Sequence, residues 1–302
     1  MNLSVCTISF RHQLISIQQI ACWAAANNFS RIELWGIHAK NLINSDYKPL
    51  RVDNSLGLNA PIEHPSDLGL PISMVSDYLP LSGRQDIAVE KTVNLCELSN
   101  FWNCSKLRTF AGDKGSIDIS VDERKQWTMR LRNLCEIAAD HGIKLVAETH
   151  PNTLTDTLAS TLQLLEEVDH SALKINFDVI HVWEAGDNPQ TAFMQLQDLI
   201  VHMHLKNIEK HSMLDVFKPG NVYAPAGSRD GIVNLFDGAF DFKSFLRFVD
   251  ENSKLELNSL DTSLEWFGHN TLETLQSDCS AVQNYMTNLY SQTPKTRSIV
   301  PA

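Results

Sequence analysis

The chain has no long apolar run, because none of its hydrophobic segments approaches the 18 or more residues that a membrane span requires. Its beginning, MNLSVCTISFRHQ, lacks the basic start, apolar stretch and small-residue cleavage site of a secretory signal. The six cysteines form no C-x-x-C pair, and most fall on apolar faces, which is typical of buried thiols in a reducing compartment. We therefore expect a cytoplasmic protein with no membrane partner.

Basic residues are in the minority, since 25 Lys and Arg stand against 36 Asp and Glu for a net charge of −11. A protein that binds nucleic acid or an anionic membrane needs a basic face, so no nucleic-acid partner is expected. The 302 residues are 43% hydrophobic and show no tandem repeat, low-complexity tract or break in composition. This favours one domain over residues 1–290, followed by a flexible C-terminal tail over 291–302.

Short apolar, β-branched segments alternate with longer segments of helical period. This alternation is typical of βα units around a parallel sheet. Eight such segments are found, the number that closes an α/β (β/α)8 TIM barrel. The predicted strands are Leu3–Ile8, Arg31–Leu34, Ile72–Ser76, Leu107–Phe110, Lys144–Ala147, Leu173–Phe177, Val201–His204 and Ser263–Glu265.

Two intervening helices have clear signals. Ser120 and Glu123 form a capping-box pattern, an apolar stripe follows from Trp127, and Gly142 marks the helix end. A second stripe of Leu158, Leu162 and Leu165 predicts a helix after the fifth strand. Lys48–Pro71 and His211–Asp241 hold much of the Pro, Gly, Asn and Asp, which predicts long loops.

The active site of a TIM barrel lies at the carboxyl ends of the strands, so the polar residues at these ends are the candidates for chemistry. Four of them, on strands five to eight, form a metal-ligand set: Glu148, Asp178, His204 and Glu265. Three converging carboxylates are too much negative charge to bury without a cation. Oxygen-rich ligation with one nitrogen suits Mn²⁺, Mg²⁺ or Co²⁺ and accommodates Zn²⁺; we expect Mn²⁺.

The alternative for each of these residues is a polar strand cap paired with Lys or Arg. His202 is interpreted as a core histidine with satisfied hydrogen bonds rather than a ligand. For Glu33, at the end of the second strand, structural pairing and a role in the pocket are equally open.

Longer motifs support a family assignment. The stretches ETHPNT at 148–153, FGHN at 267–270 and SFRHQ at 9–13 are the most specific of those that run along residues 1 to about 287. On these motifs the chain resembles the metal-dependent 3-dehydroshikimate dehydratases of the petrobactin-siderophore type. These belong to the xylose-isomerase-like TIM barrel superfamily, across which the metal tetrad is shared.

The resemblance implies a lyase that converts 3-dehydroshikimate to 3,4-dihydroxybenzoate and water. His150, two residues beyond Glu148, is the candidate base. His181 is either the general acid or a hydrogen-bond donor to the metal site. Arg108 and Lys206 are the expected cations for the substrate carboxylate. The remaining expected substrate-binding residues are Tyr78, His12 and Tyr223.

Three rival functions remain. A sugar isomerase or epimerase of the same superfamily would use the same tetrad. An endonuclease for abasic DNA needs more His ligands and a basic rim, which the net charge argues against. A metabolite-binding protein with an inactive site is the least attractive, because the tetrad is intact. The sequence leaves open the destination of the product and the assembly state, for which a homodimer is the candidate.

Overall fold

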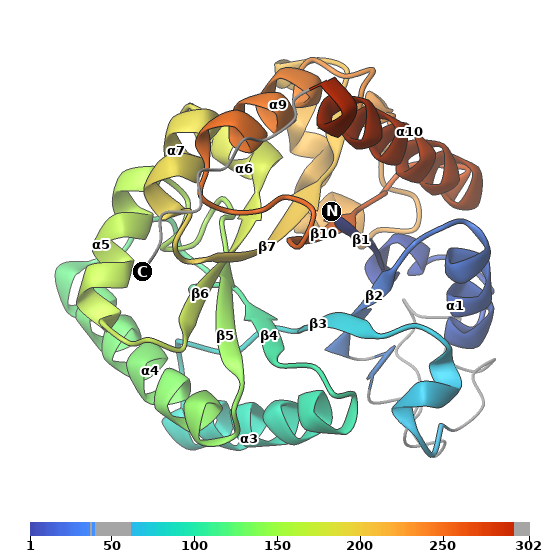
Figure 1. Cartoon of the computed structure of the whole chain (residues 1–302). Helices are drawn as coiled ribbons and strands as arrows, with labels where there is room; N and C mark the ends of the chain where they lie inside the picture. Colours follow the sequence, from blue (N-terminus) through green and yellow to red (C-terminus); the bar gives the residue numbers. More distant parts are fainter. Residues whose placement is uncertain (37, 40–61, 293–302) are drawn as a thin grey trace, which may run out of the picture.

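The structure is a computed structural model that describes residues 1–36, 38–39 and 62–292. Within these residues, parallel strands close a barrel in the order β1-β10-β7-β6-β5-β4-β3-β2, with helices around its outside (Figure 1). The strands are β1 (Asn2–Cys6), β2 (Arg31–Trp35), β3 (Ile72–Ser76), β4 (Lys106–Thr109), β5 (Lys144–Glu148), β6 (Leu173–Asp178), β7 (Ile200–Leu205) and β10 (Asp261–Leu264). The predicted (β/α)8 barrel is therefore confirmed.

Each of the eight predicted strands matches an observed one to within two residues at either end. The two-residue shifts are at the start of β10 and at the end of β1, which stops at Cys6 because Thr7–Phe10 turns into a 3-10 helix, η1. Strands of a parallel barrel are buried on both faces, so they are continuous apolar runs in the sequence. In β5, for example, Leu145, Val146 and Ala147 are all fully buried.

The helices between the strands lie on the outer surface of the barrel (Figure 1). The chain closes on itself there, because Gln283 of α10 donates a hydrogen bond to the Asn28 carbonyl after α1. The helices are α1 (Ile17–Ala26), α3 (Gln85–Phe101), α4 (Val121–Asp140), α5 (Leu158–Val168), α6 (Val179–Glu184), α7 (Pro189–Leu196), α8 (Pro219–Val222), α9 (Phe242–Asn252) and α10 (Thr271–Gln292). No helix of the described residues has the length and apolar character to cross a membrane.

The capping box before α4 is confirmed, since Ser120 and Glu123 exchange side-chain and backbone hydrogen bonds. Gly142 follows the helix with a φ of 73°, a conformation that favours glycine. The predicted helix after the fifth strand is confirmed as α5, and Leu158 and Leu165 of its predicted stripe pack against the core. The prediction is wrong for Leu162, which is 37% exposed, whereas Thr161 and Leu164 are buried. All six cysteines are free and all but Cys22 are buried, as predicted.

The predicted long loop at His211–Asp241 contains regular structure. It holds a 3-10 helix, η4 (His211–Phe217), then α8, and a short strand β9 (Ile232–Val233) that pairs with β8 (Asn207–Ile208). Most of the other predicted loop, Lys48–Pro71, lies outside the described residues; its later part includes the 3-10 helix η3 (Pro65–Leu68). Of the predicted tail, Ser291 continues α10 and residues 293–302 lie outside the description.

Candidate active site and metal centre

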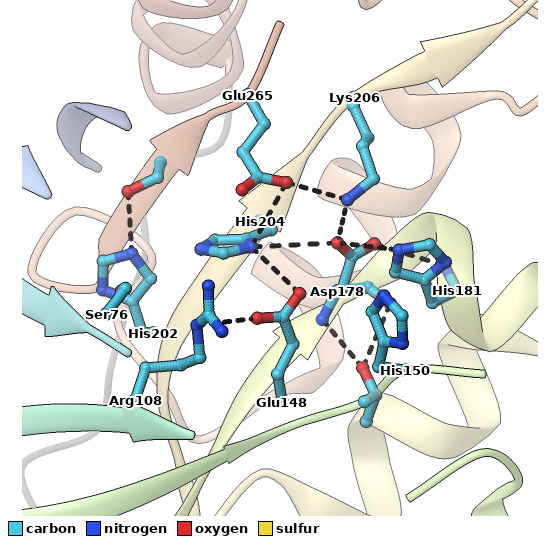
Figure 2. A network of polar contacts seen from close by, with 12 residues as sticks. Ser76, Arg108, Glu148, His150, Asp178, His181, His202, His204, Lys206 and Glu265 are labelled. Atoms are coloured by element: carbon cyan, nitrogen blue, oxygen red, sulfur yellow. Dashed lines mark hydrogen bonds and ion pairs between the residues drawn. The ribbon is translucent and has the colours of Figure 1, made fainter. Parts of the chain in front are cut away.

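Four adjacent strands bring the predicted metal ligands to one end of the barrel. Glu148 and Asp178 are the last residues of β5 and β6, His204 is the penultimate residue of β7, and Glu265 directly follows β10. Figure 2 shows the three carboxylates pointing toward the ring of His204. His204 Nδ1 lies 3.4 Å from Glu148 Oε1, 3.8 Å from Asp178 Oδ2 and 3.5 Å from Glu265 Oε2.

The orientation of the His204 ring is fixed from its other side. Its Nε2 lies 2.9 Å from Glu33 Oε2, so Nε2 carries the hydrogen and donates it to this carboxylate. His204 Nδ1 is buried and has no hydrogen-bond partner. A carboxylate that accepts from the second nitrogen of a metal-binding histidine is the usual way to hold the first nitrogen on the metal. The residues present therefore fit a metal ion at Nδ1.

Charge balance in the buried centre supports the same conclusion. The carboxylates of Glu33, Glu148, Asp178 and Glu265 carry four negative charges, against one positive charge each on Arg108 and Lys206. The difference is two negative charges, which a divalent cation neutralises. Burial by itself lowers the pKa of His204, but Glu265, Glu33 and Glu148 outweigh it and raise this pKa well above 6.5. The carboxylates around His204 thus favour a positive charge at its ring, either as a bound proton or as a metal ion. The structure has a candidate site for a divalent metal ion.

The two predicted cations contact the ligand set directly. Lys206 donates to Asp178 and lies 2.8 Å from Glu265 Oε2, while Arg108 Nε lies 3.1 Å from Glu148 Oε2. Burial lowers the pKa of Lys206, but the charges of Asp178 and Glu265 outweigh this effect and raise the pKa above its usual value. Lys206 therefore keeps its ammonium form. The Arg108 guanidinium lies 4.9 Å from the ring centres of both Tyr78 and Phe110, and its Nη1 has no partner.

His150 lies beside the metal ligands in a tightly bonded turn. Its Nδ1 donates to the Pro151 carbonyl at 2.7 Å, which leaves Nε2 as a hydrogen-bond acceptor. The ring stacks on Phe110 at 4.2 Å and contacts the ring of His181 at 4.5 Å. Burial, followed by the proximity of His181, lowers the pKa of His150 to about 3, so the imidazole is neutral.

His181 is the third residue of α6, and this helix begins directly after Asp178. The Asp178 Oδ1 atom caps this helix by accepting from the backbone N–H groups of Ile180 and His181, while Oδ2 faces His204. His181 Nδ1 contacts Glu184 Oε2 at 2.8 Å, and its Nε2 lies 3.8 Å from Asp178 Oδ2. Glu184 thereby orients the ring, with Nε2 toward the centre (Figure 2).

A cavity of about 570 Å³ opens above this centre. The predicted residues that line it are Tyr78, Arg108, Glu148, His150, His181, Lys206, Tyr223 and Glu265. The hydroxyls of Tyr78 and Tyr223, which both line it, are in contact at 2.6 Å. His12 does not line this cavity. Because the chain turns after β1, its Nε2 instead contacts the Val222 carbonyl at 3.2 Å in a separate hollow.

Glu33, His202 and Glu184 support the site without lining the cavity. Glu33 is structural: it accepts from His204 and from Ser76 Oγ at 2.5 Å, and His202 lies 3.4 Å away. Burial raises its pKa, but His204 and His202 hold it well below 4.5. His202 is a core residue, as predicted, and its Nε2 contacts Ser263 Oγ at 2.9 Å. Its hydrogen bonds are not all satisfied, because the buried Nδ1 has no hydrogen-bond partner. Glu184 is the residue that the sequence analysis did not identify. Its spacing of three residues from His181 on one helix was the signal that could have predicted their contact.

Comparisons with known proteins agree with this geometry. The model of a family described as the xylose isomerase-like TIM barrel matches residues 44–284. A 3-dehydroshikimate dehydratase of Bacillus anthracis is 46% identical over 288 residues, which cover 94% of this chain and 97% of that protein.

Solved structures extend the comparison. The crystal structure of the probable 3-DHS dehydratase AsbF, involved in petrobactin synthesis in Bacillus anthracis, matches with a TM-score of 0.82 and 45% identity. The match covers 94% of this chain and 99% of that one. An L-ribulose 3-epimerase shares the fold alone, with a TM-score of 0.70 and 14% identity over 99% of both chains. The chain belongs to the xylose isomerase-like TIM barrel family and, within it, to the 3-dehydroshikimate dehydratases.

Proposed function

We propose that the chain is a metal-dependent 3-dehydroshikimate dehydratase, a lyase that forms 3,4-dihydroxybenzoate and water. The observation that carries this proposal is the near full-length relation to the dehydratase of Bacillus anthracis. It is supported by a cavity with a metal-ligand set at its base and two histidines in its wall.

Glu148, Asp178, His204 and Glu265 would hold the metal ion, which we propose to be Mn²⁺, with Mg²⁺ or Co²⁺ as alternatives. When bound, the ion supplies Lewis-acid polarisation of the substrate ketone. Lys206 and Arg108 offset the remaining carboxylate charge, so the site tolerates an anionic substrate.

The two histidines would divide the proton transfers. His150 Nε2 is free to accept, because Nδ1 is held by the Pro151 carbonyl. We assign it the proton on the hydroxyl-bearing carbon next to the ketone. The electrons of that C–H bond form a new double bond as the β-hydroxyl leaves. His181, held at Nδ1 by Glu184, protonates this hydroxyl from Nε2, and water departs. Tautomerisation then gives the aromatic ring.

The substrate carboxylate is assigned to Arg108, with Tyr78 and Tyr223 on the same wall of the cavity. The Nη1 of Arg108 has no hydrogen-bond partner, and aromatic rings flank the guanidinium group. Both features favour the binding of a planar anion. Lys206 already contacts two carboxylates of the ligand set. We therefore propose that it acts on the substrate by reducing the negative charge of the metal centre, not by direct contact. His12 is not carried forward as a substrate contact.

Arg108→Gln is expected to weaken inhibition by 3,4-dihydroxybenzoate roughly 10- to 150-fold, the cost of losing a charge-assisted hydrogen bond. Inhibition by catechol, which lacks the carboxylate, should change far less. The measurement is the inhibition constant of each compound on metal-loaded protein. Lys91→Gln is the matched control, because Lys91 lines the same cavity but pairs with Asp77. If Arg108→Gln weakened both inhibitors equally, Arg108 would serve only to pair with Glu148 and would not bind the substrate carboxylate.

A sugar isomerase or epimerase is the second candidate, favoured by the fold that the chain shares with an L-ribulose 3-epimerase. The two are separated by incubating metal-loaded protein in D₂O with 3-dehydroshikimate or with a ketose and recording proton NMR spectra. We expect aromatic signals from the first substrate and no new sugar from the second. Deuterium incorporation and epimerisation of the ketose without any aromatic product would reverse the assignment.

Three further assignments complete the proposal. We place the protein in the cytoplasm, take a homodimer as its assembly, and take a catechol siderophore as the destination of its product. The last follows the role of the Bacillus anthracis relative in petrobactin synthesis.

A further inference from the structure

A second hollow, of about 220 Å³, lies outside the cavity that holds the metal ligands. Phe267 lines both spaces and therefore forms part of the wall between them. The other sides of the hollow come from the chain after β1, the segment around Arg229 and the start of α10. None of the proposed catalytic or metal-binding residues lines it.

The lining of this hollow is positive, although the chain as a whole has a net charge of −11. It includes the two cations Arg11 and Arg229, and no Asp or Glu among the described residues. In the described part of the chain, neither arginine has a carboxylate partner, and both donate only to backbone carbonyls.

Arg11 is the strongest sign that a ligand belongs here. The residue is only 2% exposed, with Nε donating to the Val222 carbonyl at 2.7 Å and Nη1 to the Ile8 carbonyl at 3.3 Å. Its Nη2 is buried without a partner. A charged donor left unpaired in a buried position is costly, and an anion in the hollow would remove that cost.

The electrostatics of the two arginines agree with this interpretation. Burial, followed by the charge of Arg229, lowers the pKa of Arg11 to about 10, and burial lowers the pKa of Arg229. Both groups remain cationic at neutral pH, and the charge of Arg229 disfavours that of Arg11. An anion between them would relieve this repulsion.

The start of α10 adds a third source of positive potential. This helix is 22 residues long and begins at Thr271, which lines the hollow together with Asn270. The unpaired N–H groups at a helix start, with the helix dipole, favour an anion. Gln13 donates to the Thr271 hydroxyl and so ties the chain after β1 to this helix.

We propose that this hollow is a second binding site, for a small oxyanion that carries a carboxylate or a phosphate group. The proposal is independent of the dehydratase assignment. The Val222 carbonyl accepts from both Arg11 and His12, and Val222 lines the catalytic cavity. An anion held by Arg11 therefore also stiffens one wall of that cavity.

The test is the melting temperature of the metal-loaded protein against concentration of inorganic phosphate or of acetate, with chloride keeping ionic strength constant. A saturable rise with either anion is expected from the wild type. Saturation by phosphate alone assigns a phosphate-bearing ligand, and saturation by acetate alone assigns a carboxylate. A response no larger than that to chloride overturns the proposal.

Variants locate the effect. Arg229→Gln should weaken the apparent affinity about tenfold or more. Gln13→Glu places a carboxylate in the lining, so it should also weaken the affinity and raise the melting temperature without ligand. Arg247→Gln, an exposed arginine on α9, is the matched control and should behave as the wild type. If Arg229→Gln and Gln13→Glu both left the affinity for phosphate and acetate unchanged, the anion site would not lie in this hollow.

Discussion

His150→Ala is expected to lower kcat by about 10²- to 10⁴-fold, the contribution of a positioned general base, while the protein keeps its metal ion. The variant removes none of the four proposed ligands. It removes a ring whose free nitrogen is defined by the structure, since Nδ1 is bonded to the Pro151 carbonyl and Nε2 is left to accept a proton. Metal content and kcat are measured on the same preparation.

The low pKa of His150 has a consequence for the pH profile. Burial and the proximity of His181 keep this pKa at about 3, so the ring stays neutral as the pH falls through 6.5. We therefore expect no loss of kcat/KM from protonation of His150 near the pKa of an ordinary histidine. An acid limb at pH 6.5 that disappears in His150→Ala would contradict this.

Exchange of the acidic substrate proton with solvent deuterium separates base from acid. The His150→Ala variant should fail to exchange it, whereas His211→Ala, which alters an exposed histidine outside the cavity, should exchange as the wild type does. Exchange at the wild-type rate without release of aromatic product would make His150 the acid for the leaving hydroxyl.

Glu265→Gln is expected to lower metal affinity and activity by at least about 100-fold, because the loss of a direct ligand should exceed the effect of losing an outer partner. Exhaustive chelation should abolish activity, and Mn²⁺, Co²⁺ or Mg²⁺ should restore it. Glu209→Gln removes an exposed carboxylate and serves as the control. Elemental analysis and titration of the metal-free protein with Mn²⁺ provide the measurement.

The apparent metal affinity should also rise with pH. In the metal-free protein the surrounding carboxylates raise the pKa of His204 well above 6.5, so Nδ1 is protonated at neutral pH. A metal ion must displace this proton, and higher pH favours the displacement. Calorimetry in buffers of different ionisation enthalpy should show proton release. Metal binding with no proton release, or full activity in protein verified to be metal-free, would contradict the proposed centre.

The barrel and the metal set could be predicted because their signals are local. Parallel strands buried on both faces give apolar runs, and the residue at the end of each run lies at the catalytic end of the barrel. Glu148 and Asp178 are identified by this rule alone, because each is the last residue of its strand.

Contacts between distant strands could not be predicted in this way. Glu33 and His204 are 171 residues apart. Glu33 is the middle residue of β2 rather than its last, and its local sequence is the same whether it faces the cavity or a histidine of another strand. His12 was misplaced because η1 turns the chain away from the end of β1. The rotation of α5 is set by tertiary packing, which buries Ser160 and Thr161 in place of Leu162; Ser160 Oγ accepts from Arg124.

The most direct test of the whole account is the ultraviolet spectrum of purified, metal-loaded protein mixed with 3-dehydroshikimate. We predict that the absorbance of 3,4-dihydroxybenzoate appears with the bound Mn²⁺ and disappears after chelation. A spectrum that stays free of aromatic product with the metal verified in place would contradict the account.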